Sequence, residues 1–314
     1  MDADTVIREM ALPDVLAAQE LLQRAFAEAV RQRTGRLAGP PFGPRLATVR
    51  FQKEPQGAFV ALRGGRVVGC VFSVRWGSVA YFGPIAVAPE AQGLGIAQRL
   101  IDAVHARWRR GRVRLWGLEC IGDAPQLVHL YTKMGYLPLS VGVAFVADAT
   151  AVAMPRGFGV ERLGELALGD REAALRHAKR IAGENVQGLD PTVELSAALE
   201  SEIGDTVLVH DRRGIVGFAV AHWTPLLRAD GLAVPIAAVS RRGGTRATAA
   251  LLRGLRTLAL ERQLAHVWIR VAGRRVKAQE VLRREGFRAD QSRLRMKRGR
   301  DEERASQLLF DSWL

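Results

Sequence analysis

Apolar residues recur along the chain in two periods, which predict a succession of strands and helices. Between residues 12 and 30 they fall at helical spacing, for example at Val15, Leu22 and Phe26, so a helix is expected there. Short β-rich runs bounded by turn residues predict strands. In the first half, strands are expected at Thr5–Met10, Ala58–Leu62, Val67–Arg75, Val79–Ala88 and Val113–Glu119, with two strand-like segments around Leu137–Val146. Helices are expected at Leu12–Val30, Arg45–Phe51, Gly95–Arg109 and Ala124–Met134.

Turn residues separate these elements in two distinct ways. Gly35–Pro44 contains three prolines and three glycines, which predicts a loop. Arg63-Gly64-Gly65-Arg66 joins two β-rich runs and predicts a tight hairpin. The first half therefore begins with a strand, a helix and a loop, and continues into a β-meander.

The second half repeats this order. Its matches to the first half are Val67–Val71 with Ile215–Ala219, Pro84–Ala86 with Pro235–Ala237, and Met134–Tyr136 with Glu285–Phe287. The offset is 148 residues for the first match and 151 for the other two. Several matches in one order and at nearly one spacing indicate a tandem duplication of a mixed α/β unit, with the join near Asp148–Gly159.

Length and composition agree with two soluble units. The chain has 314 residues, of which 48% are hydrophobic and 25% charged, so it can bury two cores without disulfides or metals. The N-terminus does not resemble a signal peptide, and no apolar run is long enough to span a membrane. A cytoplasmic protein is expected. Cys70 and Cys120 lie in apolar runs, which predicts buried free thiols and no metal site.

The formal net charge of +14 raises the question of nucleic-acid binding. Lys and Arg are spread over both halves, aromatic residues amount to only 6%, and no nucleic-acid motif is evident. Clusters such as Arg107–Arg114 and Arg283–Arg300 leave a nucleic-acid-binding protein as the third alternative. A polyanionic cofactor would account for part of the positive charge equally well.

The sharpest local feature is a strand, a glycine-bearing turn and a helix within Gly83–Ala97. Glycines there let the backbone approach a ligand, and the N–H groups at a helix start can hold phosphate. No Gly-Lys-Ser/Thr is present, so this is not a P-loop, and the spacing is not that of the dinucleotide fingerprint. By itself, such a turn is more often only a turn.

Two motifs give this turn a more specific interpretation. Gln92-Gly93-Leu94-Gly95-Ile96-Ala97 resembles the acetyl-CoA loop of the GNAT acetyltransferase superfamily, Gln/Arg-x-x-Gly-x-Gly/Ala. About forty residues later, Leu130–Tyr136 resembles the second GNAT landmark, Leu-Tyr-x-Lys-x-Gly-Phe/Tyr. The resemblance covers the first 150 residues well, and the tandem arrangement extends it more weakly over the rest.

The resemblance implies a role for each matching position. The residues that would bind the cofactor acetyl-CoA are Ile85, Ala86, Val87, Gln92, Gly93, Leu94, Gly95, Ile96 and Ala97. Backbone groups of Ala86 and Val87 would pair with the pantetheine arm, and the loop amides would hold the pyrophosphate. Tyr131 would protonate the departing thiolate; otherwise it is a core aromatic residue.

An attacking amine must lose a proton, because an alkylamine of the lysine type has a pKa of about 10.4. Glu119, at the end of a predicted strand, is the candidate catalytic base, and a solvated carboxylate is the alternative. Asp123 and His129 are weaker candidates, interpreted instead as a helix cap and a surface residue.

The corresponding features of the second half are incomplete. Its loop reads Ser240 to Ala247, and either Thr245 or Arg246 stands at the place of the second glycine. At the offset of 151, Leu282 replaces Tyr131, and leucine cannot donate a proton. The second half is therefore predicted to be structural or to shape the substrate pocket.

The expected fold is a tandem of GNAT folds, each a mixed, mostly antiparallel twisted sheet of about six to seven strands flanked by helices. The predicted units are a GNAT acetyltransferase domain over residues 1–150, a degenerate GNAT-like domain over 158–300, and a C-terminal tail over 301–314. The tail ends in apolar residues, so docking on the body or on a second subunit, and hence a homodimer, stays open.

The expected function is transfer of an acetyl group from acetyl-CoA to a primary amine by direct attack in a ternary complex. The acceptor, a small-molecule amine or a protein amine, is not specified by the sequence. Its selection is expected from the Arg31–Pro44 loop, the last strands of the first half and the second half. A non-catalytic acetyl-CoA-binding sensor, which would need the loop but not Tyr131, is the second alternative.

Overall fold

The computed structural model describes residues 4–35, 42–224, 226, 231–300 and 308–313. The helices of the first half are α1 (Asp14–Thr34), α2 (Leu46–Lys53), α3 (Ile96–Arg110) and α4 (Pro125–Lys133). Its strands are β1 (Thr5–Glu9), β2 (Phe59–Arg63), β3 (Arg66–Trp76), β4 (Val79–Val87), β5 (Leu115–Cys120) and β6 (Leu137–Asp148). These agree with the predicted elements, except that β6 is one long strand where two segments were expected.

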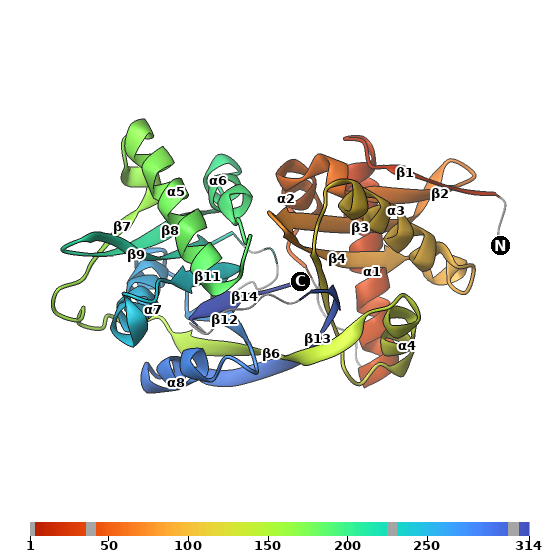
Figure 1. The fold of residues 1–314 in the computed structure, drawn as a ribbon. Coiled ribbons are helices and arrows are strands. Elements are labelled where there is room, and N and C mark those ends of the chain that lie inside the picture. Colours follow the sequence, from red (N-terminus) through yellow and green to blue (C-terminus); the bar gives the residue numbers. More distant parts are fainter. Residues whose placement is uncertain (1–3, 36–41, 225, 227–230, 301–307, 314) are drawn as a thin grey trace.

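The second half follows the same order. Its helices are α5 (Leu168–Asn185), α6 (Thr192–Glu200), α7 (Gly244–Glu261) and α8 (Val276–Arg284). Its strands are β7 (Gly159–Arg162), β8 (Gly204–Asp211), β9 (Gly214–His222), β10 (Gly231–Val234), β11 (Ile236–Val239), β12 (His266–Ala272), β13 (Arg288–Gly299) and β14 (Leu309–Asp311). Figure 1 shows the two halves side by side, each with helices around its strands.

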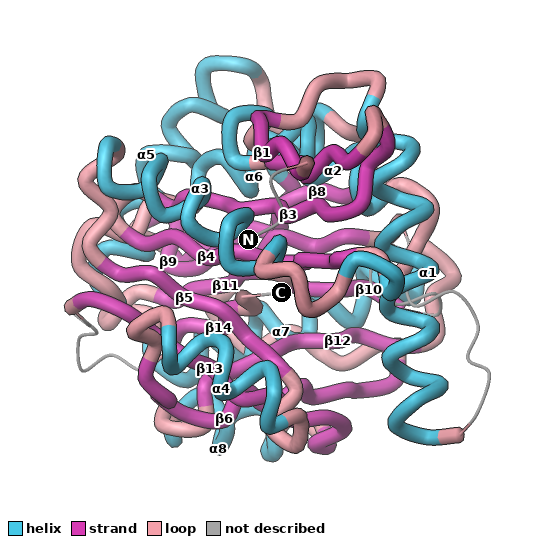
Figure 2. The backbone as a smooth tube through the Cα atoms, turned by 90° about the vertical axis from the view of Figure 1, so that its right-hand side faces the viewer, coloured by secondary structure: helices cyan, strands magenta, loops and turns pink. Residues whose placement is uncertain are grey.

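In the described part of the chain, the strands of both halves belong to one 14-stranded sheet, mostly antiparallel and flanked by helices (Figure 2). Its strand order is β1-β2-β3-β4-β5-β13-β6-β12-β10-β9-β11-β14, and β8 joins β9 and β7. The predicted mixed α/β class is thereby confirmed. The sequence predicted a separate sheet for each half, whereas the structure merges them.

The two halves exchange their last long strands. β13 of the second half pairs with β5 of the first, and β6 of the first half pairs with β12 of the second. β13 and β6 also pair with each other, and Figure 1 shows both running beneath the two halves. Each half thus completes its sheet with a strand from the other, which joins the halves through backbone hydrogen bonds.

Helix α3 is held against the sheet by one apolar stripe. Its buried apolar residues recur at helical spacing: Ile96, Leu100, Ile101, Val104 and Trp108. Each such side chain contributes about 1.5–3 kcal/mol when fully buried. A Cβ at Gly69 of β3 would lie only 3.0 Å from the Ile96 and Leu100 side chains, so glycine permits this close packing. Because Gly69 pairs with Val87, this contact places the start of α3 beside the end of β4.

A buried charge cluster joins the two halves on the other side of the sheet. Lys53 of α2 forms an ion pair with Glu194 of α6, and these side chains are 3% and 1% exposed. His222 Nε2 lies 3.7 Å from the Glu194 carboxylate. Arg50 donates a hydrogen bond of 3.0 Å to the Tyr81 hydroxyl. Burial lowers the pKa of Lys53, so this interface depends on the Glu194 partner.

Cys70 and Cys120 are free and buried, as predicted. Among the helices in the described part of the chain, none is long and apolar enough to cross a membrane.

Candidate active site

The candidate site begins where strands β4 and β5 separate. Their parallel pairing covers only three residue pairs, from Val79 with Leu115 to Tyr81 with Gly117. β4 then continues to Val87 and pairs with β3 through Ile85, Ala86 and Val87. The predicted pantetheine-binding residues Ile85, Ala86 and Val87 therefore lie on the part of β4 that has left β5.

The predicted pyrophosphate loop lies between the end of β4 and the start of α3. Gly93 and Gly95 have φ values of 80° and 76°, in the left-handed region that favours glycine. A Cβ at either position would have no heavy atom within 4 Å, so the loop is open on that side. Gln92 donates from Nε2 to the Val87 carbonyl at 3.3 Å, tying the loop to β4.

The backbone N–H groups of this loop are available for a ligand. Within the described chain, those of Gly93 to Ala97 donate to no backbone acceptor. The first N–H groups of a helix have no intrahelical partner, and the positive end of the helix dipole attracts anions. The loop and the start of α3 therefore fit a pyrophosphate group, with Leu94, Ile96 and Ala97 contributing through their backbone.

Tyr131 lies on α4 and is only 5% exposed. Its ring packs at centroid distances of 5.9 Å from Phe82 and 6.4 Å from Tyr136, edge to face in both cases. Burial raises the pKa of Tyr131 well above the ordinary value, so its hydroxyl stays protonated. A protonated phenol can donate a proton, but it cannot act as a base.

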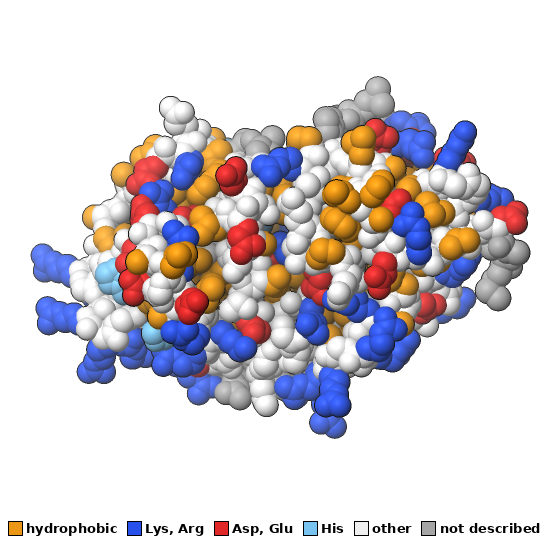
Figure 3. Space-filling view, turned by 90° about the horizontal axis from the view of Figure 1, so that it is seen from above, with side chains coloured by type: hydrophobic (Ala, Val, Ile, Leu, Met, Phe, Trp, Pro, Cys, Tyr) orange, Lys and Arg blue, Asp and Glu red, His pale blue; other side chains and the backbone are white. Residues whose placement is uncertain are grey.

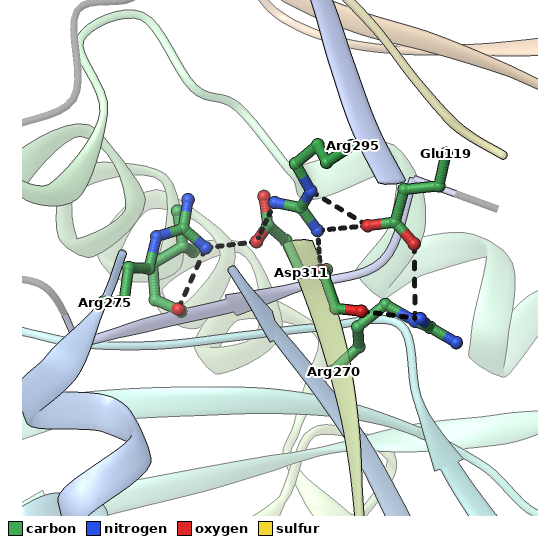
Figure 4. A network of polar contacts seen from close by, with 7 residues as sticks. Glu119, Arg270, Arg275, Arg295 and Asp311 are labelled. Atoms are coloured by element: carbon green, nitrogen blue, oxygen red, sulfur yellow. Dashed lines mark hydrogen bonds and ion pairs between the residues drawn. The ribbon is translucent and has the colours of Figure 1, made fainter. Parts of the chain in front are cut away.

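Glu119 lies on β5 beyond the residues that pair with β4, and its carboxylate is already engaged. Arg295 Nε donates to Oε1 at 2.9 Å, and Arg270 Nε lies 3.4 Å from Oε2. The Glu119 side chain is fully buried, which excludes the predicted alternative of a solvated carboxylate. Figure 4 shows the carboxylate facing both arginines.

The second half supplies the groups that sequence reasoning missed. Arg295 lies directly opposite Glu119 across the β5–β13 pair. Its Nη1 donates to Asp311 Oδ1 at 2.9 Å, so the guanidinium lies between two carboxylates (Figure 4). The Arg295 guanidinium also lies 4.3 Å from the Trp313 ring centroid. Strand exchange brings these residues together, and no local sequence pattern could indicate it.

The two weaker candidates lie on the surface. Asp123 is exposed, and its carboxylate lies 3.4 Å from Arg33 Nη1. The cap position of α4 is Ala124, which makes no side-chain capping bond, so the prediction that Asp123 caps this helix was wrong. His129 is exposed, as predicted.

The second half lacks an equivalent loop. At the offset of 151, Gly93 corresponds to Gly244 and Gly95 to Arg246. Gly244 keeps a left-handed φ of 58°, but helix α7 begins there, so the residues equivalent to Leu94 and Gly95 already lie in the helix. Arg246 carries a Cβ and does not favour the φ of 76° found at Gly95. Leu282, at the place of Tyr131, is fully buried in the second core.

Positive side chains are not confined to one half on the face seen in Figure 3. Lys and Arg side chains are spread over both halves there and are interspersed with Asp and Glu.

Comparisons with known proteins agree with this geometry. Residues 17–136 match the model of the acetyltransferase (GNAT) family. No curated protein matches the chain in sequence. Among solved structures, a putative acetyltransferase from Pyrococcus horikoshii is similar at 16% identity and a TM-score of 0.68, with 100% of this chain and 96% of that chain covered.

Two further structures are similar over nearly the full length. A GCN5-related N-acetyltransferase from Sphaerobacter thermophilus has 16% identity and a TM-score of 0.64, covering 97% of this chain and 98% of its own. A tandem GNAT protein from the clavulanic acid biosynthesis pathway has 15% identity and a TM-score of 0.57, covering 96% and 99%. This chain therefore contains a GNAT acetyltransferase domain over residues 17–136, and its whole length has the fold of tandem GNAT proteins.

Proposed function

We propose that this protein is an acetyl-CoA-dependent N-acetyltransferase with one working cofactor site, located in the first half. One observation carries the proposal: β4 and β5 separate after Tyr81 and Gly117, and an open glycine loop leads from β4 into α3. The match to the GNAT family supports acetyl transfer. The acceptor is proposed to be a primary amine.

In the first half, one set of residues is proposed to bind acetyl-CoA and another to transfer protons. Ile85, Ala86 and Val87 offer the backbone edge of β4 to the pantetheine arm. The amides of Gly93 to Ala97 offer a cradle for the pyrophosphate. Acetyl-CoA supplies the activated acetyl thioester. No protein nucleophile is invoked, so the amine attacks directly in a ternary complex.

Tyr131 is the proposed proton donor. As the nitrogen–carbon bond forms and the carbon–sulfur bond breaks, the sulfur leaves as a thiolate that needs a proton. The raised pKa of Tyr131 keeps a proton on its hydroxyl at neutral pH. General acid catalysis of this kind typically contributes about 10²–10⁴-fold in rate.

Glu119 is the proposed acceptor of the amine proton, directly or through a water. Because Arg295 and Arg270 already engage its carboxylate, the amine must compete with two guanidinium groups for it. Glu119→Gln tests this role. A variant with unchanged kcat and an unchanged pH profile would exclude Glu119 as the base.

A non-catalytic acetyl-CoA-binding module is the second candidate, and the burial of Tyr131 favours it. A tyrosine packed between Phe82 and Tyr136 can be a core residue that serves no chemistry. The two candidates differ in their need for Tyr131. Tight acetyl-CoA binding without transfer to any amine of a broad panel would favour the module.

The first experiment is calorimetric titration with acetyl-CoA. We expect micromolar binding at one site per chain, abolished in the double variant Gly93→Val and Gly95→Val. Gly244→Val is a matched control, because Gly244 also has positive φ and an open Cβ direction but lies in the second half. Loss of binding in the control alone would place the cofactor site in the second half. An absence of acetyl-CoA binding to the wild type would refute the proposed function.

A further inference from the structure

The C-terminal strand occupies a place in the second half that corresponds to the proposed pantetheine site. β14 pairs with β11 in antiparallel register, with Asp311, Phe310 and Leu309 opposite Ile236, Ala237 and Ala238. At the offset of 151, the three residues of β11 correspond to Ile85, Ala86 and Val87. The backbone edge proposed to bind cofactor in the first half thus binds the chain's own C-terminal segment in the second.

The surrounding strands separate in the same way in both halves. β10 pairs in parallel with β12 from Gly231 with His266 to Val234 with Ile269. After Pro235 the chain continues as β11, and β14 lies in contact with both β11 and β12. Figure 1 shows β14 beside these two strands. The second half therefore retains the separated-strand slot, and residues 308–313 fill it.

The segment is fixed by backbone and apolar contacts. Val239 N–H donates to the Leu308 carbonyl at 3.0 Å, and Ser312 N–H donates to the Pro235 carbonyl at 2.9 Å. Phe310 is fully buried in the core of the second half, together with Leu308. At the far end, the Trp313 ring packs so closely on Gly117 of β5 that a Cβ there would overlap it.

The slot also recognises a carboxylate. Asp311 is bonded by Arg275 and by Arg295, whose side chains are 2% and 1% exposed. The two guanidinium groups hold the pKa of Asp311 well below its ordinary value. Charged groups this deeply buried require partners of opposite charge. A slot of this kind fits an extended peptide with one acidic residue, whereas a pantetheine arm carries no charge.

We propose that the second half uses its slot as a binding site for an extended acidic–aromatic peptide, the C-terminal segment of residues 308–313, in place of a cofactor. Its equivalence to a cofactor slot rests on the proposed function, but the peptide site itself does not. The chain is accordingly expected to bind a single acetyl-CoA. Exchange of the peptide and binding of acetyl-CoA are then independent events at separate sites.

Peptide exchange tests the proposal on the full chain. A specific protease site placed between Arg300 and Leu308 allows the folded protein to be nicked, and a fluorescent peptide of residues 308–314 is then added. We expect saturable exchange at one site per chain. Peptides with Phe310→Ala or Asp311→Asn should bind at least tenfold more weakly, and Ser312→Ala, altered at a partly exposed position, is the matched control.

A cofactor competition distinguishes this proposal from its alternatives. Excess acetyl-CoA should leave the bound peptide in place, and titration of the intact chain should give one site. Displacement of the peptide, a second acetyl-CoA site after nicking, or a failure of the peptide to rebind would each overturn the proposal. Peptide exchange without any acetyl-CoA binding would instead refute only the proposed function.

Hydrogen exchange provides a second measurement should the nicked chain lose its fold. In intact Phe310→Ala protein, the Val239 amide should exchange at least tenfold faster, because it donates to Leu308. The amides of β2, far from the slot, should be unchanged. Unaltered protection at Val239 would contradict the assignment of Phe310 as the anchor.

Discussion

Arg295 and Glu119 lie directly opposite each other across the β5–β13 pair, although their positions in the chain differ by 176. Arg295 Nε donates to Glu119 Oε1 at 2.9 Å, and both side chains are almost completely buried. The candidate base of the first half is therefore held by the second half. In the proposed function, the two halves therefore form one catalytic unit, because each contributes residues to the position of the base.

Replacement of Arg295 should destabilise the protein strongly. Arg295→Met leaves the buried carboxylates of Glu119 and Asp311 with one fewer partner, and breaking such a buried network typically costs about 3–5 kcal/mol. Urea denaturation measures the free energy of unfolding of each variant. The control is Arg288→Met, since Arg288 pairs with Asp148 on the surface and should matter by no more than about 1 kcal/mol. Equal losses in the two variants would contradict the importance of the buried network.

Tyr131→Phe should lower kcat by about 10²–10⁴-fold, the range of general acid catalysis. Acetyl-CoA affinity should be unchanged, because the ring and its packing on Phe82 remain. Steady-state kinetics and calorimetry together measure both quantities. Tyr136→Phe is the control, since the Tyr136 hydroxyl is bonded to His105 and has no proposed role in transfer. Full activity in Tyr131→Phe, lost only on changing the second half, would overturn the assignment of the active half.

The Lys53–Glu194 ion pair should be strongly coupled. Glu194→Gln leaves a buried lysine without its counter-charge and should cost about 3–5 kcal/mol, as should Lys53→Met. The double variant should be much less destabilised than the sum, because neither charge then remains unpaired. A double-mutant cycle of unfolding free energies tests this. Additive losses would show that the two residues do not stabilise the interface as a pair.

Acid should destabilise the fold through two buried histidines. Burial lowers the pKa of His222 to about 3 and that of His105 to about 4. Between pH 6.5 and 4 the unfolded chain therefore binds protons that the folded chain does not, so stability rises with pH in this window. The stabilisation is complete above pH 6.5 and is lost as the pH falls toward 4.

The slope of unfolding free energy against pH measures this effect. His222→Asn should reduce the slope by about one proton within the window of pH 6.5 to 4. His129→Asn is the control, because it makes the same substitution at an exposed position. An identical slope in wild type and His222→Asn would show that His222 is protonated in the folded protein.

The sequence by itself predicted the elements and the position of the open glycine loop. Apolar spacing in α3, with Leu100 and Val104 directed to the core, and glycines at positions 93 and 95 are local properties of the chain. The offset of 151 residues likewise indicated a second unit and the loss of Tyr131 at Leu282. Periodicity and turn chemistry act over a few residues, so such features can be read without a structure.

Only the tertiary structure decided which strands pair across the halves. The apolar pattern of Arg288–Gly299 and of Leu137–Asp148 is equally compatible with pairing inside each half. Their exchange, and with it the contact of Arg295 with Glu119, depends on which sheet edges lie within reach after folding. The position of Asp311 is likewise decided by the tertiary structure. It depends on the pairing of β14 with β11 and on the buried arginines, which require a carboxylate partner.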